Sequence, residues 1–378
     1  MTTTINNEHK KFNVPNLRFK EFQGEWEKSK LSDLCTFFSG GTPSSSNKDF
    51  YGGDIAFIRS GELHADSTEL FITQDGYDNS SAKMVEIGDL LLAMYGATSG
   101  DISISKIKGA INQAILCIRT NQNKKFIESV WNKHVSKILR KYLQGGQGNL
   151  SADIVKGISF SFPTLEEQEK IANLISLLDE RIATQNKIIE DLKKLKSAIS
   201  ERLFKSVKGS IVLLSDICDI VKGKQINGEN LSERGRYYVM NGGTEPSGYY
   251  SDYNVEANTI SISEGGNSCG YVQFNTFPFW SGGHCYSIQN VTGNVDNLYL
   301  YHYLKSNEDN IMKLRIGSGL PNIQKKDLAM FKIIVPTLEQ QMTISTFLSS
   351  IERKAEIERR IQNAIQKQKL YLLQQMFI

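Results

Sequence analysis

The residues best placed to contact a ligand lie on short loops that are dense in glycine. Ser39-Gly40-Gly41-Thr42-Pro43, Gly96 to Gly100 and Ser281-Gly282-Gly283-His284 are examples in this chain of 378 residues. Glycine lets a backbone approach a ligand closely, and polar neighbours can then form hydrogen bonds with that ligand. An ordinary tight turn is the simpler interpretation of any single loop. The loops are therefore candidate binding surfaces whose ligand the glycines do not identify.

Signatures of catalysis are missing from the sequence. Lys222-Gly223-Lys224 precedes Gln225, whereas a phosphate-binding Walker A loop needs Ser or Thr at that place. Gly317-Ser318-Gly319 lacks the outer glycine of a nucleophile elbow. The sequence has no Pro-Pro dipeptide, which the Asn/Asp-Pro-Pro-aromatic loop of amino-methyltransferases requires, and no Pro-Asp that could open a common nuclease motif. We therefore predict that the chain is not an enzyme.

Metal binding is not indicated either. The five histidines show no HExxH or paired ligand spacing, and the five cysteines show no CxxC spacing. His284 beside Cys285 is the one suggestive pair, and a structural role explains it better than metal ligation. We expect no metal site, and we expect the cysteines to be buried and reduced.

Composition favours a folded protein without a membrane span. Aromatic residues make up 10% of the chain and there are only seven prolines, which argues against disorder. No apolar run approaches the roughly 20 residues that a membrane span needs. The polar segment 1–12 lacks the apolar stretch of a secretory signal, so we expect a cytoplasmic protein. The net charge of +3 does not by itself indicate a nucleic-acid partner.

Two long segments have the pattern of helices. Residues 164–208 and 337–378 contain no Gly and no Pro, although the whole chain has 30 glycines. Apolar residues recur in them mostly at steps of three and four, with Lys, Arg, Glu and Gln between, which is typical of helices that pair with each other. A helix of 40 residues would be roughly 60 Å long.

The chain also repeats itself. Pro163-Thr164-Leu165-Glu166-Glu167-Gln168 matches Pro336-Thr337-Leu338-Glu339-Gln340-Gln341, and the offset of 173 then holds without a gap to Phe204 and Phe377. The preceding segments open alike, since Leu31-Ser32-Asp33-Leu34-Cys35 recurs as Leu214-Ser215-Asp216-Ile217-Cys218 at an offset of 183. The first globular unit is therefore ten residues longer than the second. We predict a globular domain over 1–163, a helix over 164–208, a second domain over 209–336 and a second helix over 337–378.

Both globular segments are predicted to be rich in strands. Short apolar or alternating runs bounded by Gly, Asn, Ser and Asp indicate strands. The clearest are Ile55–Ile58, Asp89–Met94, Ala114–Ile118, Tyr237–Met240, Thr259–Ile262 and Phe331–Val335.

These blocks resemble the DNA-specificity subunit of type I restriction–modification systems. The resemblance rests on the duplicated Pro-x-Leu-x-x-Gln entry to a long helix after a glycine-rich variable domain, and it covers essentially the whole chain. The first segment is similar to one type of target-recognition domain through Gly40-Gly41-Thr42-Pro43-Ser44 and Gly96-Ala97-Thr98-Ser99-Gly100. The second is similar to another type through Ile262-Ser263-Glu264-Gly265-Gly266 and Gly319-Leu320-Pro321-Asn322-Ile323.

The resemblance implies a mixed α/β fold with two target-recognition domains, each reading one half of a split site in double-stranded DNA. The two helices would form an antiparallel coiled coil that relates the two halves of an internal repeat with pseudo-two-fold symmetry and sets the spacing of the half-sites. The subunit would have no catalytic site and no cofactor of its own. Its methyltransferase partners would bind S-adenosylmethionine, and its restriction/translocase partners would use ATP and Mg.

Within this family, base contacts would come from polar side chains on the close-approaching loops. In the first domain the candidates are Ser45, Asn47, Lys48, Arg59, Tyr95, Thr98, Ser99 and Gln147. In the second domain they are Lys222, Lys224, Gln225, Asn241, Ser247, Tyr249, Asn267, Ser268 and Ser318. Each could equally be a solvated turn residue.

Three alternatives remain open at the level of the sequence. The chain could be a stand-alone enzyme with an unrecognised motif, or a coiled-coil scaffold that clamps a protein and binds no DNA. It could also serve a related multi-subunit restriction system. Charge bears on the DNA hypothesis, because residues 209–336 carry 10 basic and 12 acidic residues. A domain with net charge −2 binds phosphates weakly alone, so we expect partner subunits to supply much of the positive charge.

Overall fold

A computed structural model describes residues 13–142, 149–317 and 321–378. The chain divides into two compact units, the first formed by residues 1–184 with 362–378 and the second by residues 185–361. Each unit combines one strand-rich domain with segments of both long helices. The mixed α/β class expected from the sequence is confirmed.

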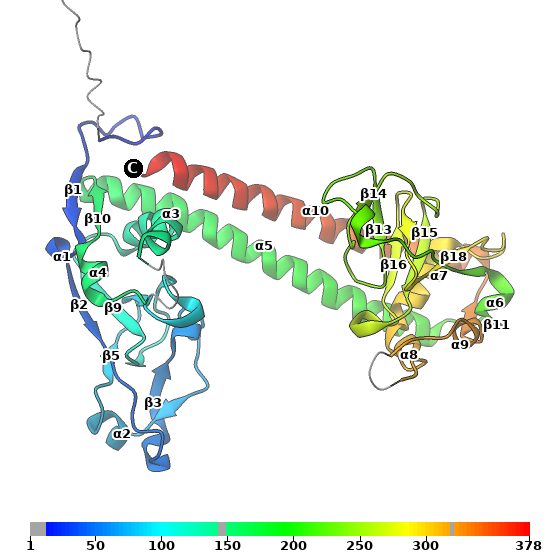
Figure 1. Ribbon diagram of the computed structural model, residues 1–378, viewed down its shortest axis with the longest axis horizontal. Coiled ribbons are helices and arrows are strands. Elements are labelled where there is room, and N and C mark those ends of the chain that lie inside the picture. Colours follow the sequence, from blue (N-terminus) through cyan, green and yellow to red (C-terminus); the bar gives the residue numbers. More distant parts are fainter. Residues whose placement is uncertain (1–12, 143–148, 318–320) are drawn as a thin grey trace, which may run out of the picture. The chain divides into compact units, whose positions relative to one another are not determined.

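The long helices are α5 (Leu165–Ser206) and α10 (Leu338–Met376), with 42 and 39 residues (Figure 1). They pair antiparallel within each unit. In the second unit, Gln185 bonds to Glu358 and, further along α5, Lys196 pairs with the earlier residue Glu352 of α10. In the first unit, the beginning of α5 packs against the end of α10, where Ile171 and Ile175 share a core with Leu373 and Met376. The predicted antiparallel pair is therefore confirmed.

A buried glutamine explains why the motif at the start of each helix recurs. Gln341, fully buried, donates to the carbonyl oxygens of Pro336 and Asn294 at 2.9 and 3.1 Å and accepts from the amide of Asp296 at 2.8 Å. Gln168 makes the matching bonds in the first unit. Its side-chain amide donates to the Pro163 carbonyl and to the Gln122 side chain, and its side-chain oxygen accepts from the Asn123 amide, just before the helix Lys124–Tyr142. Each glutamine thus joins the first turn of a long helix to the loop just before another helix, Lys124–Tyr142 in the first domain and Asn297–Ser306 in the second.

The first domain is built around two four-stranded sheets. One has the order β2-β9-β6-β7 and is antiparallel throughout, and the other has the order β4-β3-β8-β5 with β3 and β8 parallel. The strands of these sheets and of the ribbon β1-β10 are β1 (Glu27–Lys30), β2 (Cys35–Ser39), β3 (Tyr51–Ile58), β4 (Phe71–Ile72), β5 (Lys83–Val85), β6 (Leu90–Ala93), β7 (Ile102–Ile104), β8 (Gly109–Ile111), β9 (Ile115–Thr120) and β10 (Ser159–Phe162). The helices are α1 (Leu31–Leu34), α2 (Gln74–Asp78), α3 (Lys124–Tyr142) and α4 (Ala152–Gly157).

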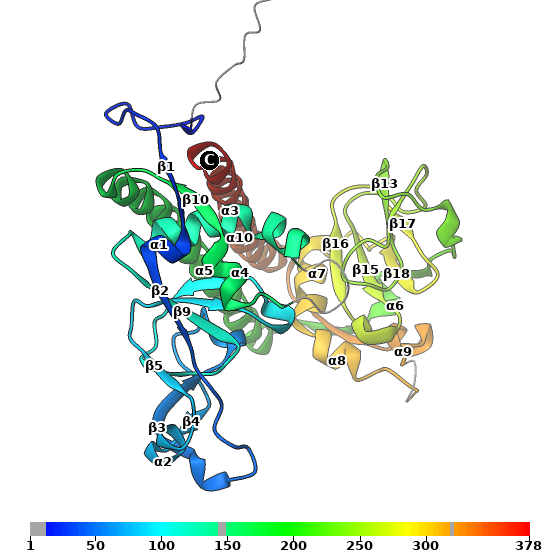
Figure 2. The ribbon, with the colours of Figure 1, turned by 60° about the vertical axis from the view of Figure 1, so that its left-hand side comes forward.

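The second domain repeats this plan, and β16, β15 and β18 lie side by side in its four-stranded sheet (Figure 2). Its sheets have the orders β12-β18-β15-β16 and β14-β13-β17, with β13 and β17 parallel, and a ribbon joins β11 to β19. The strands are β11 (Ser210–Leu213), β12 (Asp219–Lys222), β13 (Tyr237–Met240), β14 (Tyr249–Tyr250), β15 (Thr259–Ser263), β16 (Val272–Asn275), β17 (Trp280–Ser281), β18 (Cys285–Gln289) and β19 (Lys332–Val335). The helices are α6 (Leu214–Ile217), α7 (Asn297–Ser306), α8 (Glu308–Met312) and α9 (Lys325–Ala329).

The two domains can therefore be compared strand by strand. The sheet β2-β9-β6-β7 corresponds to β12-β18-β15-β16, and the parallel pair β3 and β8 corresponds to β13 and β17. All six strands expected from the sequence are present. The central strands are buried because they are apolar on both faces, as in Leu90-Leu91-Leu92-Ala93. All five cysteines are buried and unpaired, as predicted.

Candidate nucleic-acid interface

The turn that follows the central strand β6 is shaped by two glycines and a hydroxyl group. Gly96 and Gly100 have φ angles of +75° and +88°, a region that residues with a side chain rarely adopt. Between them, the amide of Ser99 donates to the Gly96 carbonyl at 3.1 Å, and its hydroxyl donates to the Met94 carbonyl at 3.0 Å. The 3₁₀ turn η3 (Gly96–Thr98) presents an exposed Ala97 and a partly exposed Thr98.

The second domain builds the same turn from a different sequence. Gly266 and Gly270 have φ angles of +72° and +86°, and they flank the 3₁₀ turn η5 (Gly266–Ser268). The Cys269 thiol donates to the Glu264 carbonyl at 3.2 Å, as the Ser99 hydroxyl does to Met94. Asn267 is exposed and Ser268 partly exposed. The same backbone conformation therefore presents Ala97 and Thr98 in the first domain, and Asn267 and Ser268 in the second.

Three further loops of the second domain contact one another beside the end of β15. The Asn241 side chain, just after β13, accepts from the His284 amide at 3.2 Å, and the Gly242 carbonyl accepts from the Ser263 hydroxyl at 2.6 Å. After β12, Gly223 approaches so closely that a Cβ there would lie 2.1 Å from the Gly282 carbonyl oxygen. Glycine is therefore required at that crossing. It leaves exposed polar residues on either side, namely Lys222, Lys224 and Gln225.

The first domain has the matching crossing. A Cβ at Gly40, just after β2, would lie 1.8 Å from the Ile111 carbonyl oxygen, so glycine is required here too. Beside it, the Thr42 hydroxyl donates to Gln113 at 2.7 Å. Arg59 directly follows β3, which is the place that Asn241 holds after β13.

The loops after β2, β3, β6 and β8 form the loop cluster of the first domain, and those after β12, β13, β15 and β17 form the loop cluster of the second. Each loop cluster carries a cation held by a carboxylate. Arg59 donates from Nη2 and Nε to the two oxygens of Glu62 at 2.7 and 3.2 Å, and this contact raises the pKa of Arg59 and lowers that of Glu62. In the second domain, Lys222 Nζ lies 2.6 Å from Glu264 Oε1. In both pairs the carboxylate is largely buried and about half of the basic side chain is exposed. Both cations are thus oriented before any ligand arrives.

The structure brings together six of the predicted contact residues of the second domain at these loops: Lys222, Lys224, Gln225, Asn241, Asn267 and Ser268. Others lie elsewhere. Ser45, Asn47 and Lys48 belong to the loop before β3, at the opposite end of that strand from Arg59, where the Asn47 side chain caps a short 3₁₀ turn. Ser247 and Tyr249 lie on or beside β14. Tyr95 packs partly against the core, while Gln147 and Ser318 fall outside the described residues.

The sequence predictions did not include Glu62 or Glu264. Glu264 takes the place that Met94 has in the first domain, because it directly follows the central strand and precedes the glycine turn. A comparison of the patterns Gly-Ala-Thr-Ser-Gly and Gly-Asn-Ser-Cys-Gly would have aligned these positions. It would have shown that an acidic residue in one domain replaces an apolar residue in the other.

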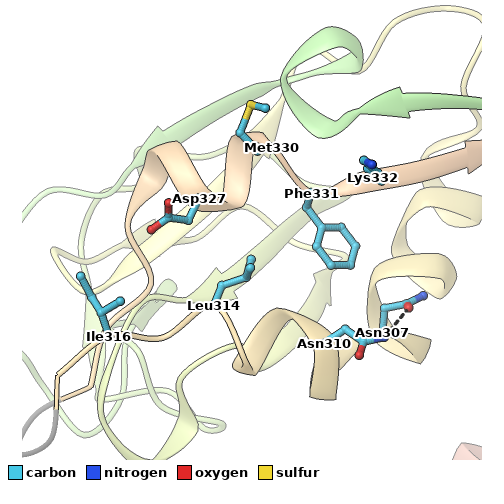
Figure 3. A pocket seen from close by; sticks show the side chains of 8 residues that line it. All are labelled: Asn307, Asn310, Leu314, Ile316, Asp327, Met330, Phe331 and Lys332. Atoms are coloured by element: carbon cyan, nitrogen blue, oxygen red, sulfur yellow. Dashed lines mark hydrogen bonds between the residues drawn. The ribbon is translucent and has the colours of Figure 1, made fainter.

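A separate hollow of about 710 Å³ lies between α8, α9 and the start of β19 (Figure 3). Its lining is mostly apolar, with exposed Met330 and Ile316, and its charged groups are Asp327 and Lys332. The hollow shares no residue with the loop clusters described above, so it is not part of the candidate interface.

Within residues 13–142, 149–317 and 321–378, no group of three or more His, Cys, Asp or Glu side chains could hold a metal ion. Over the same residues, no helix is both long and apolar enough to cross a membrane.

Comparison with known proteins identifies the family. Residues 23–194 and 209–367 each match the type I restriction modification DNA specificity domain, and the two matches span most of the chain. The chain belongs to this family. Each match begins in a strand-rich domain and continues into the long helix that follows it, so the repeat seen in the sequence is a repeat of the specificity domain.

Two relatives of this specificity-domain protein match it over nearly their whole length. The MjaX specificity subunit of Methanocaldococcus jannaschii is 26% identical, with 96% of this chain and 95% of the relative covered. The MjaVIII type I specificity subunit of the same organism is 25% identical, with 93% of each chain covered. The fold is similar to that of a type I S subunit from M. genitalium, with a TM-score of 0.69 at 17% identity over 97% of this chain and 99% of that one.

Proposed function

We propose that this chain is the DNA specificity subunit of a type I restriction–modification complex, and that each domain reads one half of a bipartite site. The observation that carries the proposal is the pair of equivalent turns, where one backbone presents Thr98 in the first domain and Ser268 in the second. Base readout needs a backbone that approaches closely and side chains that can vary without disturbing it. Because the side chains differ at matched positions, the two half-sites should differ in sequence.

The long helices would set the distance between the half-sites and dock the methyltransferase subunits. Exposed apolar residues at matched positions of the repeat support docking, since Leu165 and Leu338 correspond to each other, as do Ile188 and Ile361. Large exposed apolar side chains are typical of protein interfaces. A surface presented twice by one chain suits two copies of the same partner.

Catalysis would reside in the partners. The methyltransferase subunits would bind S-adenosylmethionine, and the restriction/translocase subunits would use ATP and Mg. The cytoplasm is the proposed site of action, where bacterial and archaeal DNA is accessible. The chain's own contribution would be specificity, with much of the charge that neutralises DNA phosphates supplied by the partners, because residues 209–336 carry more acidic than basic side chains.

An exchange of one domain tests the proposal. The chain would be expressed with its methyltransferase in a host without other DNA methylation, and N6-methyladenine would be mapped by single-molecule sequencing. We expect a bipartite motif, and exchange of residues 209–336 for another recognition domain should change one half of it only. A change in both halves would contradict modular reading.

Two further outcomes would replace the proposal. Methylation or cleavage of DNA by the purified chain alone would indicate an enzyme. The absence of any sequence-specific shift of DNA by the complex would favour a protein-binding scaffold.

A further inference from the structure

Lys222 is a cation with a fixed position at the edge of the second loop cluster. It is the last residue of β12, and its Nζ lies 2.6 Å from Glu264 Oε1. The Lys222 side chain is 53% exposed, while that of Glu264 is 10% exposed. The Tyr286 hydroxyl donates to the same carboxylate oxygen at 3.1 Å. The carboxylate is thus anchored in the domain, and the ammonium group is held at its surface.

The second oxygen of Glu264 has no hydrogen-bond partner among the described residues. Glu264 Oε2 is buried and lies 3.8 Å from His284 Nδ1, beyond hydrogen-bond distance. A buried carboxylate needs compensation of its charge, and Lys222 is its close cationic partner. This requirement keeps the Lys222 side chain near Glu264, whereas a free surface lysine would sample many rotamers.

An ammonium group held in this way can distinguish bases. Lysine has three N–H donors, of which Glu264 occupies one, so two remain for a ligand. In the major groove, guanine offers two adjacent acceptors, O6 and N7, whereas adenine offers N7 beside an amino donor. Two donors therefore match guanine and conflict with adenine. A lysine free to move would instead favour the phosphates, which carry no sequence information directly.

We infer that Lys222 reads a guanine in the half-site bound by the second domain, with Glu264 as its positioning residue. The inference rests on the proposed function. It also concerns one half-site only, because the first domain lacks the pair. Ser39 ends β2 where Lys222 ends β12, and Met94 follows β6 where Glu264 follows β15. Neither residue can supply a charge.

The experiment uses the chain in complex with its methyltransferase subunits. Duplexes carrying each of the four bases at every position of the half-site would be tested for binding. Lys222→Ala should lower the preference for guanine roughly ten- to one-hundred-fold at one position of one half-site. Glu264→Gln, which keeps the shape of the side chain, should reduce the same preference and leave other positions unchanged. Lys205→Ala is the matched control, since Lys205 also pairs with a carboxylate, that of Glu201, but lies on α5.

Three outcomes would overturn the inference. Lys222→Ala could weaken binding equally for all bases and reduce the salt dependence, which would identify a phosphate contact. The affected position could require a base other than guanine. The motif could also be unchanged. In each case the wild-type complex would still recognise a bipartite motif, whereas loss of the proposed function itself would leave the wild-type complex without one.

Misfolding is controlled with a conservative variant. Lys222→Arg keeps the charge beside Glu264 and can present paired donors to guanine, so it should retain the preference for guanine. Thermal unfolding of all variants would be compared. If Lys222→Arg melted like the wild type and had lost the preference for guanine while Lys222→Ala kept it, the assignment would be wrong.

Discussion

Gln185 and Glu358 face each other across the paired helices, with the side-chain amide of Gln185 donating to the Glu358 carboxylate. The two residues are 173 positions apart, which is the offset of the internal repeat, so they are equivalent positions that contact each other. The interhelical ion pairs follow the same relation. Lys369 pairs with Asp179, and their repeat equivalents Lys196 and Glu352 pair as well. The contacts of the helix pair therefore follow the symmetry of the sequence repeat, which the pair Gln185 and Glu358 breaks chemically.

Exchanging these two side chains tests that symmetry. Gln185→Glu alone places two carboxylates face to face in a buried contact, so we expect a lower melting temperature at neutral pH and recovery at acidic pH. Combining it with Glu358→Gln restores one amide and one carboxylate. Arg181 stands four residues before Gln185, as Lys354 stands before Glu358, so the exchanged carboxylate would again have a nearby cation. We expect the double variant to melt near the wild-type temperature. A decrease in melting temperature equal to the sum of the decreases in the two single variants would contradict the symmetry.

Gln341 should contribute strongly to stability. Gln341→Ala removes three hydrogen bonds and leaves the Asp296 amide without this acceptor in a buried region, which we expect to cost about 2–4 kcal/mol in the free energy of unfolding. The neighbouring Gln340 is exposed, so Gln340→Ala is a matched control with an expected effect within about 0.5 kcal/mol. Urea unfolding measures both. Equal effects of the two substitutions would show that the buried bonds are unimportant.

Arg18 holds a buried carboxylate in the first unit. Its Nε and Nη2 each lie 2.7 Å from the oxygens of Glu167, which is 1% exposed, and this bond raises the pKa of Arg18. Arg18→Met leaves the Glu167 charge unpaired, and we expect a loss of about 3–5 kcal/mol. Adding Glu167→Gln should recover part of that loss. Lys20→Met removes an exposed cation from the same segment and should be nearly neutral in urea unfolding followed by tryptophan fluorescence.

We expect His302 to make the stability of the chain depend on pH. Burial lowers the pKa of His302 to about 4. Nearby Glu352 raises this pKa, and Lys196 lowers it further. The unfolded chain therefore binds a proton more readily than the folded chain between about pH 6.5 and 4, and stability falls as the pH drops through that window. The loss approaches about 3 kcal/mol for a shift of this size.

The variant His302→Gln isolates this contribution. Its stability should change less than that of the wild type between pH 7 and pH 4.5, as measured by denaturant unfolding at each pH. A parallel pH profile for His302→Gln and the wild type would rule out His302 as the source.

The long helices could be predicted from the sequence because their information is local. A stretch without Gly or Pro and with apolar residues at helical spacing has few other ways to fold, and α5 and α10 follow that pattern for 42 and 39 residues. The helix α3, also free of Gly and Pro, was not among the expectations. The glycine-rich loops and short apolar runs around this helix indicate strands.

The matched turns could not be predicted in the same way. Gly100 and Gly270 are retained because each has a positive φ, but Ser99 and Cys269 make the same bond with different atoms, so the sequences look unrelated between the glycines. Glu264 was missed for a related reason. An acidic residue before two glycines indicates a solvated loop, and only the packing of β12, β15 and β18 shows that its carboxylate is buried under Lys222.

Substitutions in the turn Gly96–Gly100 should distinguish the residue that stabilises the turn from the residue that contacts DNA. Ser99→Cys copies the second domain and should preserve both the melting temperature and the methylation motif, whereas Ser99→Ala removes the bond to the Met94 carbonyl and should cost about 1 kcal/mol. Thr98→Ala should leave stability within about 0.5 kcal/mol of the wild type and relax base preference in the half-site of the first domain, because Thr98 is partly exposed on the turn. Methylome sequencing and thermal unfolding together give both readouts. A changed motif for Ser99→Cys with an unchanged motif for Thr98→Ala would reverse the two roles, since the hydroxyl that supports the turn would then be the one that reads DNA.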